Sequence, residues 1–138
     1  MCAQPGKAGQ SGALGRTAVA VSVNLFIALV YLSPLPDRLR GGLFVFFHSY
    51  CTDIVLPFGV YLLTWMAEAR VPLLRGWWVR ALLVFGVASF AEMLQLFGVP
   101  LLGRTFDPLD FVMYAGGVLL AVLADRLLLD RLFPLRFS

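Results

Sequence analysis

The chain has 138 residues, of which 60% are hydrophobic and only 14% are charged, and its formal net charge is +3. A soluble domain is usually about half apolar and about a quarter charged, so this composition excludes an ordinary soluble fold and indicates an integral membrane protein. The small positive charge does not indicate nucleic-acid binding, because basic residues in a membrane protein chiefly set its orientation.

The length allows about four membrane-spanning helices with short loops, because each span needs about 20 apolar residues. We therefore expect residues 1–138 to form a single all-α membrane domain, a four-transmembrane-helix bundle with no separate soluble domain. Cys2 and Cys51 are the only cysteines, and they lie in the predicted head and in a predicted span. A disulfide framework is therefore not expected.

The N-terminal region is predicted to be a flexible head over residues 1–16, followed by a first span over residues 17–35. Two prolines, Pro34 and Pro36, end the span, because proline has no N–H to donate and disrupts a helix. The apolar region is longer than that of a secretory signal peptide, and no small-residue cleavage site follows it. We expect a helix that is retained in the mature protein.

The second span is predicted over residues 42–66 and contains His48 and Asp53. Pro57 follows Asp53 by four residues, so the Asp53 carbonyl loses its helical hydrogen bond and a kink is expected there. The freed carbonyl would need water or a neighbouring helix.

The third span is predicted over residues 77–98, with Trp77 and Trp78 at the membrane–water interface. Arg80 lies close enough to the end of this span to reach the interface with its charged group. Glu92 lies deeper, and Gln95 follows it by three residues, on the same face of the helix. An ionisable residue inside a span needs a partner or a wet cavity.

The fourth span is predicted over residues 107–124, since Asp107 at the cap and Pro108 at the first helical position favour a helix start. Asp110, Tyr114 and Gly117 then lie on the same face as Asp107. The pair Gly116–Gly117 would let a neighbouring helix, from this chain or a partner, approach closely. The tail, residues 125–138, is amphipathic and is expected to continue the helix at the membrane interface.

The positive-inside rule predicts that both termini are cytoplasmic. Of the 11 Lys and Arg residues, eight lie in the head, the second loop and the tail, on one side of the predicted membrane. The three on the other side are Arg38, Arg40 and Arg104. With this orientation, the polar residues within spans two to four fall mostly in the outer half of the membrane. The sequence therefore predicts an outward-facing polar pocket between these three spans.

The residues predicted to bind a ligand in this pocket are His48, Asp53, Glu92, Gln95, Arg104, Asp107 and Asp110. An arginine fork can hold a phosphate or a carboxylate through two hydrogen bonds, and the acids would orient the bound group. A structural interpretation stays open, in which Asp107 only caps the helix and Glu92, Arg104 and Asp110 form an internal lock.

No nucleophile–base pair stands out, and one His with two separated Cys cannot form a usual zinc site. We expect no metal and no other cofactor, although the four acids could hold a hard divalent cation through oxygen atoms. A membrane enzyme would need His48 or Asp53 as its base. Whether the chain is an enzyme stays open, with a non-enzymatic role favoured.

The C-terminal half resembles the VanZ-like family of small bacterial membrane proteins with four helices. The resemblance is strongest over residues 89–117 and rests on the motif residues Glu92, Gln95, Gly103, Arg104, Asp107, Asp110, Gly116 and Gly117. It implies a multi-pass protein of the bacterial cytoplasmic membrane with a role in the cell envelope. The family takes its name from a protein linked to resistance to the glycopeptide teicoplanin.

The resemblance and the polar pocket together suggest that the chain binds a polar envelope component, either a lipid-linked cell-wall precursor or a phospholipid headgroup. A contribution to teicoplanin resistance is the expectation that follows from the family. The alternatives are an enzyme that acts on an envelope lipid, and a structural subunit whose polar cluster is an internal lock. A homo-oligomer or a partner membrane protein would use the face with Gly116 and Gly117.

Overall fold

The computed structural model describes residues 6–99 and 106–134, and this part of the chain is helical with no strand. Four helical stretches are long and apolar enough to cross a membrane: Gln10–Leu32, Gly42–Ala67, Trp77–Leu96 and Pro108–Leu132. The predicted all-α chain with four spans is thereby confirmed. The protein is a multi-pass membrane protein.

The first span is α1 (Gly6–Leu32), which begins well before the predicted boundary. Part of the head that we expected to be flexible is therefore helical. The physical reason is a tertiary contact, because Arg16 is only 2% exposed and forms an ion pair of 2.7 Å with Glu68. At its other end α1 stops before Pro34, and the short helix α2 (Leu35–Arg38) turns the chain.

The second span consists of α3 (Gly42–Phe46), the π-helical turn η1 (Phe47–Cys51) and α4 (Thr52–Ala67), which follow one another without a break. The helix α4 continues through Pro57, and the kink expected there stays a prediction. A departure from α-helical geometry lies upstream, in η1. Such π turns inside helices often occur at functional sites. This one ends just before Asp53, which lies in the first turn of α4.

The third span is α5 (Trp77–Leu96), which follows the 3₁₀ turn η2 (Pro72–Arg75). Gly98, with a φ of 81°, terminates α5 in the left-handed conformation that glycine adopts without strain. The Gly98 N–H donates to the Gln95 carbonyl, and the Val99 N–H donates to the Leu94 carbonyl. This pattern is a Schellman motif, and it fixes the end of α5 close to the predicted boundary.

The fourth span is α6 (Pro108–Ala124), continued by the π-helical η3 (Asp125–Leu129) and by α7 (Asp130–Leu132). The predicted helix start is confirmed, because an Asp107 carboxylate oxygen accepts a hydrogen bond of 2.9 Å from the Leu109 N–H. The tail continues the helix as predicted. However, Asp125 is fully buried, so the tail begins inside the protein rather than at the membrane interface.

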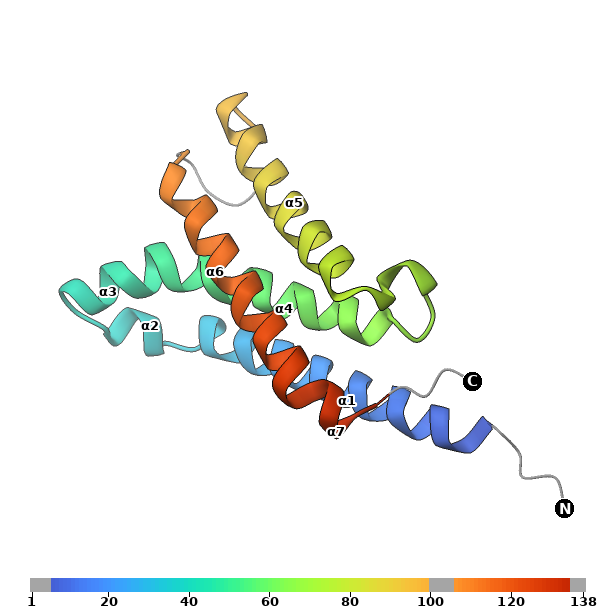
Figure 1. Ribbon diagram of the computed structural model, residues 1–138. Helices are drawn as coiled ribbons and strands as arrows, with labels where there is room; N and C mark the ends of the chain where they lie inside the picture. Colours follow the sequence, from blue (N-terminus) through green and yellow to red (C-terminus); the bar gives the residue numbers. More distant parts are fainter. Residues whose placement is uncertain (1–5, 100–105, 135–138) are drawn as a thin grey trace, which may run out of the picture.

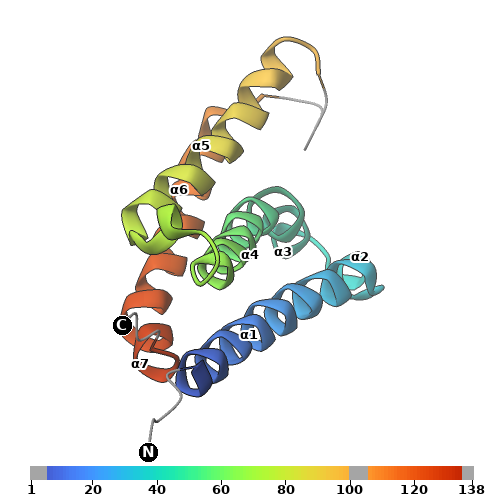
Figure 2. The same ribbon diagram turned by 90° about the vertical axis from the view of Figure 1, so that its right-hand side faces the viewer.

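The helix α4 is central to the packing, since it contacts α1, α5 and α6. Figures 1 and 2 show α1 on one side of α4 and the pair α5 and α6 on the other. The crossing of α4 and α6 is close because Gly117 has no side chain, and a Cβ there would overlap the carbonyl oxygen of Ile54. Gly117 therefore packs within the chain, and Gly116 alone remains of the glycine pair predicted to face a partner.

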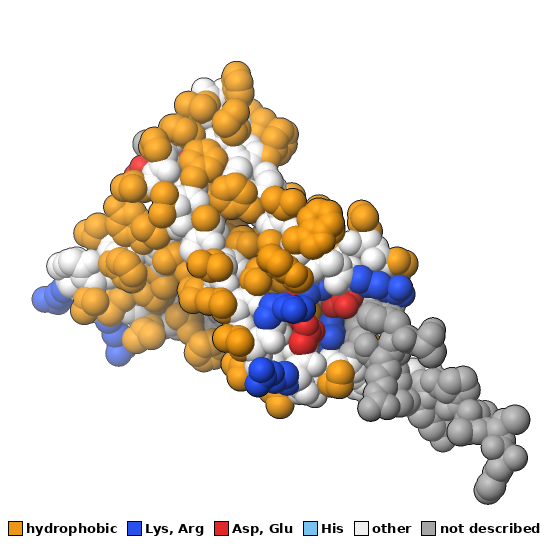
Figure 3. All heavy atoms as spheres, in the orientation of Figure 1, with side chains coloured by type: hydrophobic (Ala, Val, Ile, Leu, Met, Phe, Trp, Pro, Cys, Tyr) orange, Lys and Arg blue, Asp and Glu red, His pale blue; other side chains and the backbone are white. Residues whose placement is uncertain are grey.

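The buried core is small and lies where α4, α5 and α6 meet, around Tyr61, Trp65, Val84, Val118 and Ala121. Most other large apolar side chains are exposed, as expected for helices that face lipid. Figure 3 shows hydrophobic side chains over most of one face, with charged side chains gathered near α2 and near the end that holds α7.

Candidate functional site

The acids and the buried arginines within the spans form two groups, at opposite ends of the helices. The first group contains Asp53 from α4, Glu92 from α5, and Asp107, Asp110 and Tyr114 at the start of α6. We call it the acidic cluster. The second lies at the end that holds the first turns of α1 and the last turns of the chain.

In the acidic cluster, Glu92 joins α5 to α6. Its side chain is almost fully buried, with 1% exposure. One carboxylate oxygen accepts a hydrogen bond of 3.1 Å from the Tyr114 hydroxyl, and the other accepts one of 3.3 Å from the Asp107 N–H. Both oxygens of Glu92 are therefore satisfied within the protein, by neutral donors.

Asp53 and Asp110 bring α4 and α6 together in the same cluster. Their carboxyl groups lie within hydrogen-bonding reach of each other. Both side chains are half-buried, and they also interact electrostatically with Glu92 and Asp107. Within residues 6–99 and 106–134, none of these four acids forms an ion pair.

The remaining predicted ligand-binding residues have different positions. Gln95 is half-buried one turn after Glu92, near the end of α5. Arg104 lies outside the described residues. His48 is exposed, and its ring nitrogen Nδ1 lies 3.1 Å from the carbonyl oxygen of Phe44, on its own helical turn. Its ring also packs on Phe44 and Phe47, so these contacts direct it along its own helix rather than towards the acids.

The described part of the acidic cluster does not have the geometry of a metal site. In residues 6–99 and 106–134, no group of three His, Cys, Asp or Glu side chains could hold a metal ion. The cluster can instead accept hydrogen bonds, because its surplus polar atoms are carboxylate oxygens. Amines, ammonium groups and hydroxyls are the chemical groups that suit it.

The second group is a buried ion-pair network that the sequence analysis missed. Its principal members are Arg16, Glu68, Arg80 and Asp125, and they come from all four spans or from their ends. Glu68 accepts from both arginines, at 2.7 Å from Arg16 and 2.8 Å from Arg80. Arg80 also pairs with Asp125, which accepts a further hydrogen bond of 2.6 Å from the Tyr61 hydroxyl.

The burial of Arg80 corrects one sequence prediction. We expected its charged group to reach the membrane interface, but Arg80 is only 2% exposed and is held between Tyr61 of α4 and Asp125 of η3. The acids explain the difference, since a buried arginine is tolerated where carboxylates pair with it. The signal was present in the sequence, because two arginines and two acids lie near span ends on the same predicted side.

The network also joins the early part of α1 to the residues around α7. Arg16 packs over the Trp65 ring, with 4.6 Å between the guanidinium carbon and the ring centroid. It donates to the Phe133 carbonyl at 3.0 Å and pairs with Asp130 at 3.3 Å. The first turns of α1 and the residues around α7 therefore lie together at one end of the molecule, which Figure 2 also shows.

No protein-family model, no curated protein and no solved structure matches this chain. The resemblance to the VanZ-like family therefore stays a prediction, and the function has to be argued from the two polar groups.

Proposed function

We propose that this chain is a protein of the bacterial cytoplasmic membrane that binds a polar lipid headgroup at its acidic cluster. The proposal includes cytoplasmic termini, which rest on the excess of basic residues in the head, the second loop and the tail. The acidic cluster then lies in the outer half of the membrane, where headgroups of the outer leaflet and lipid-linked cell-wall precursors are within reach.

One observation carries this proposal: the Asp53–Asp110 pair is half-buried in the spans and has no ion-pair partner among the described residues. Carboxyl groups inside a membrane are costly and usually mark a functional site. Glu92 is satisfied internally, so the groups that remain for a ligand are Asp53 and Asp110. They suit a headgroup that presents an amine or several hydroxyls.

The proposal also includes Arg104, which would bind a different part of the headgroup from Asp53 and Asp110. As a sequence prediction, it would hold the phosphate of the same headgroup by a two-pronged hydrogen bond. Phosphate together with an amine or hydroxyls is common to aminophospholipids and to lipid-linked aminosugars. We therefore propose a ligand that carries a phosphate together with an amine or hydroxyls.

The binding experiment uses the full chain in nanodiscs and compares Asp110→Asn with wild type. The probes are phosphatidylethanolamine and a polyprenyl-diphosphate-linked aminosugar, which separate the two lipid sources. Loss of one charge-assisted hydrogen bond should weaken binding of the preferred probe about tenfold. Asp37→Asn is the matched control, because Asp37 is exposed in α2, on the same side of the membrane. Equal binding by Asp110→Asn and wild type would overturn the proposal.

Orientation is tested separately with cysteine reporters in a Cys2→Ser, Cys51→Ser background. A reporter at Asp37, between the first two spans, should react with a membrane-impermeant thiol reagent in intact cells. A reporter at Arg131, in α7, should react only after the cells are permeabilised. The reverse pattern would place the acidic cluster at the cytoplasmic leaflet and refute the outward-facing site.

A role in the response to teicoplanin forms part of the same proposal, through the VanZ-like resemblance. Expression of the chain in a susceptible host should raise the inhibitory concentration of teicoplanin, and Asp110→Asn should remove that increase. An unchanged inhibitory concentration with wild type would refute the resistance role and leave the headgroup site to the binding experiment.

A structural role is the second candidate, and Glu92 favours it. Its two internal hydrogen bonds hold α5 against the start of α6. Such bonds are expected if the acidic cluster only stabilises the fold of a structural subunit. Under this alternative, Asp110→Asn would lower the melting temperature without changing lipid binding. The exposed position of His48 gives an enzymatic role no support.

A further inference from the structure

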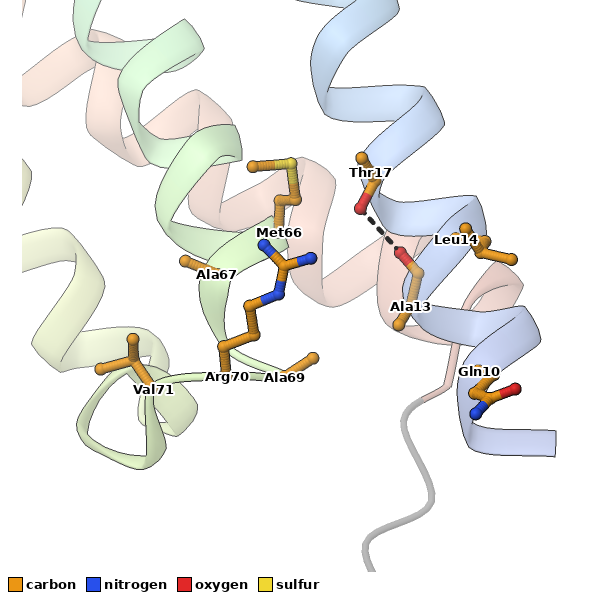
Figure 4. Close-up of a pocket in the computed structure, with 9 residues that line it drawn as sticks. All are labelled: Gln10, Ala13, Leu14, Thr17, Met66, Ala67, Ala69, Arg70 and Val71. Atoms are coloured by element: carbon orange, nitrogen blue, oxygen red, sulfur yellow. Dashed lines mark hydrogen bonds between the residues drawn. The ribbon is translucent and has the colours of Figure 1, made fainter. Parts of the chain in front are cut away.

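A groove lies between the first turns of α1 and the end of α4, and Figure 4 shows its lining. Its volume is about 390 Å³, and most of its lining is apolar, including Leu14, Met66 and Val71. It lies at the end of the molecule that holds the ion-pair network, opposite to the acidic cluster.

Arg70 is the charged group of this groove. Figure 4 shows its side chain extending along the end of α4 towards Met66, on the side that faces α1. Arg70 is exposed, and no acid among the described residues pairs with its guanidinium. Arg16 and Arg80 differ from it, because each is buried and paired with Glu68.

The charges around the groove favour an anionic occupant. Glu68 and Asp125 pair with Arg16 and Arg80, and Asp130 pairs with Arg16 and Arg126, so each acid of the network already has an arginine partner other than Arg70. A guanidinium without an internal partner at a membrane surface is suited to phosphate, which it can hold through two hydrogen bonds. Basic pockets between membrane helices on the cytoplasmic side are a known setting for anionic lipid headgroups.

The groove also has a path for an acyl chain. Gln10 and Thr17 line it, and Asn24 and Tyr31 line a second cavity, of about 290 Å³, between the same two helices. These four residues are seven apart in the sequence, so they lie along one face of α1. The two cavities therefore follow the same seam between α1 and α4.

The polar atoms along this seam are largely occupied by the protein itself. Thr17 donates to the Ala13 carbonyl at 3.0 Å, and Asn24 donates to the carbonyls of Ala20 and Gly59. The rest of the seam offers mainly apolar contacts to a ligand. A molecule with one anionic end and a long apolar part fits this arrangement.

We propose that the groove binds an anionic phospholipid, with its phosphate on Arg70 and an acyl chain along the seam between α1 and α4. This site is separate from the headgroup site of the acidic cluster and does not depend on it. It would hold the first span against the second through a lipid of the leaflet at this end of the molecule, which is the cytoplasmic leaflet under the orientation of the proposed function.

The test is native mass spectrometry of the full chain in mild detergent, titrated with phosphatidylglycerol or with phosphatidylcholine. Wild type should retain phosphatidylglycerol in preference to phosphatidylcholine. Arg70→Gln should weaken phosphatidylglycerol binding about fivefold, the effect of one basic residue near an anionic surface. Arg131→Gln is the matched control, since Arg131 is exposed at the same end of the molecule and loses the same charge.

A second variant tests the shape of the groove and leaves Arg70 unchanged. Ala13→Phe puts a bulky side chain into the lining and should also reduce phosphatidylglycerol retention. Equal losses in Arg70→Gln and Arg131→Gln would overturn the proposal, because they would indicate general surface charge. Equal retention of the two lipids by wild type would overturn it as well. Phosphatidylethanolamine binding in the Asp110→Asn comparison reports on the other site and should not respond to Arg70→Gln.

Discussion

The two polar ends of this protein satisfy their charges in opposite ways. At the network end, two buried arginines meet two buried acids, so charge is balanced inside the protein. At the acidic end, the described groups are four acids with neutral donors such as the Tyr114 hydroxyl. A balanced network can serve as structure alone, whereas surplus negative charge inside a membrane requires a proton, a ligand or a cation.

The contrast also separates two kinds of arginine at the network end. Arg16 and Arg80 are internal, and each contacts at least one carboxylate. Arg70 lines the open groove, two residues after Glu68, and forms no ion pair with an acid of the network among the described residues. The burial of Arg16 and Arg80 against paired acids indicates a structural role. The exposure of Arg70 beside an apolar groove favours a role in binding a ligand.

The largest expected effect is the loss of Arg80. Arg80→Gln leaves Asp125 and Glu68 with fewer donors in a buried site, and Asp125 Oδ1 already has no partner in the described residues. Breaking a buried pair by removing one partner costs about 3–5 kcal/mol. Thermal unfolding in mild detergent should show a large drop in the midpoint. Arg131→Gln should leave the midpoint nearly unchanged, and similar midpoints for both variants would contradict a structural network.

The next effect concerns the close crossing of α4 and α6 at Gly117. Gly117→Ala places a methyl group against the Ile54 carbonyl in the backbone of α4, which can move only if the helices separate. Overpacking of this kind typically costs about 1–3 kcal/mol. Gly116→Ala is the control, because a Cβ there meets no atom within 4 Å. The unfolding midpoint should fall in the first variant only, and an equal fall in both would mean that the contact with Ile54 is not the cause.

Replacing a tyrosine by phenylalanine at each polar end compares the acidic cluster with the ion-pair network directly. Tyr114→Phe removes the hydroxyl that donates to Glu92, and that oxygen then has no described donor. Tyr61→Phe removes a donor to Asp125, which keeps Arg80. A hydrogen bond to a charged group contributes about 1.5–3 kcal/mol, so Tyr114→Phe should destabilise the protein more than Tyr61→Phe. Equal midpoints in detergent unfolding would mean that Glu92 finds another donor.

The smallest expected effect is at the helix cap of the acidic cluster. Asp107→Ala removes the side-chain acceptor for the Leu109 N–H but keeps the backbone N–H that donates to Glu92. Loss of an N-cap costs about 1 kcal/mol. Asp107→Ser restores a capping oxygen without the charge and should recover most of the stability in the same unfolding assay. No recovery would mean that the charge of Asp107, rather than its cap, stabilises the site.

Parts of the candidate site followed from the sequence, because depth along a helix depends only on residue number. Asp53, Asp110 and Glu92 were placed in one polar group by their depth, and Asp107, Asp110, Tyr114 and Gly117 by helical spacing. The structure brings Asp53 to Asp110 and Tyr114 to Glu92. The depth of His48 along its span could not show that its ring packs against Phe44 and Phe47 rather than against the acids, because that depends on the direction of the side chain.

The sequence by itself determined the four spans and the start of α6, because apolar length and capping chemistry act within a few neighbouring residues. Only the tertiary structure decided that Arg80 is buried, that α1 begins before Arg16, and that Gly117 packs on Ile54 within the chain. Each of these depends on a partner far along the chain. A charge near the end of a span has the same local sequence whether it faces water or an acid from another helix, and only the packing of the helices selects between the two.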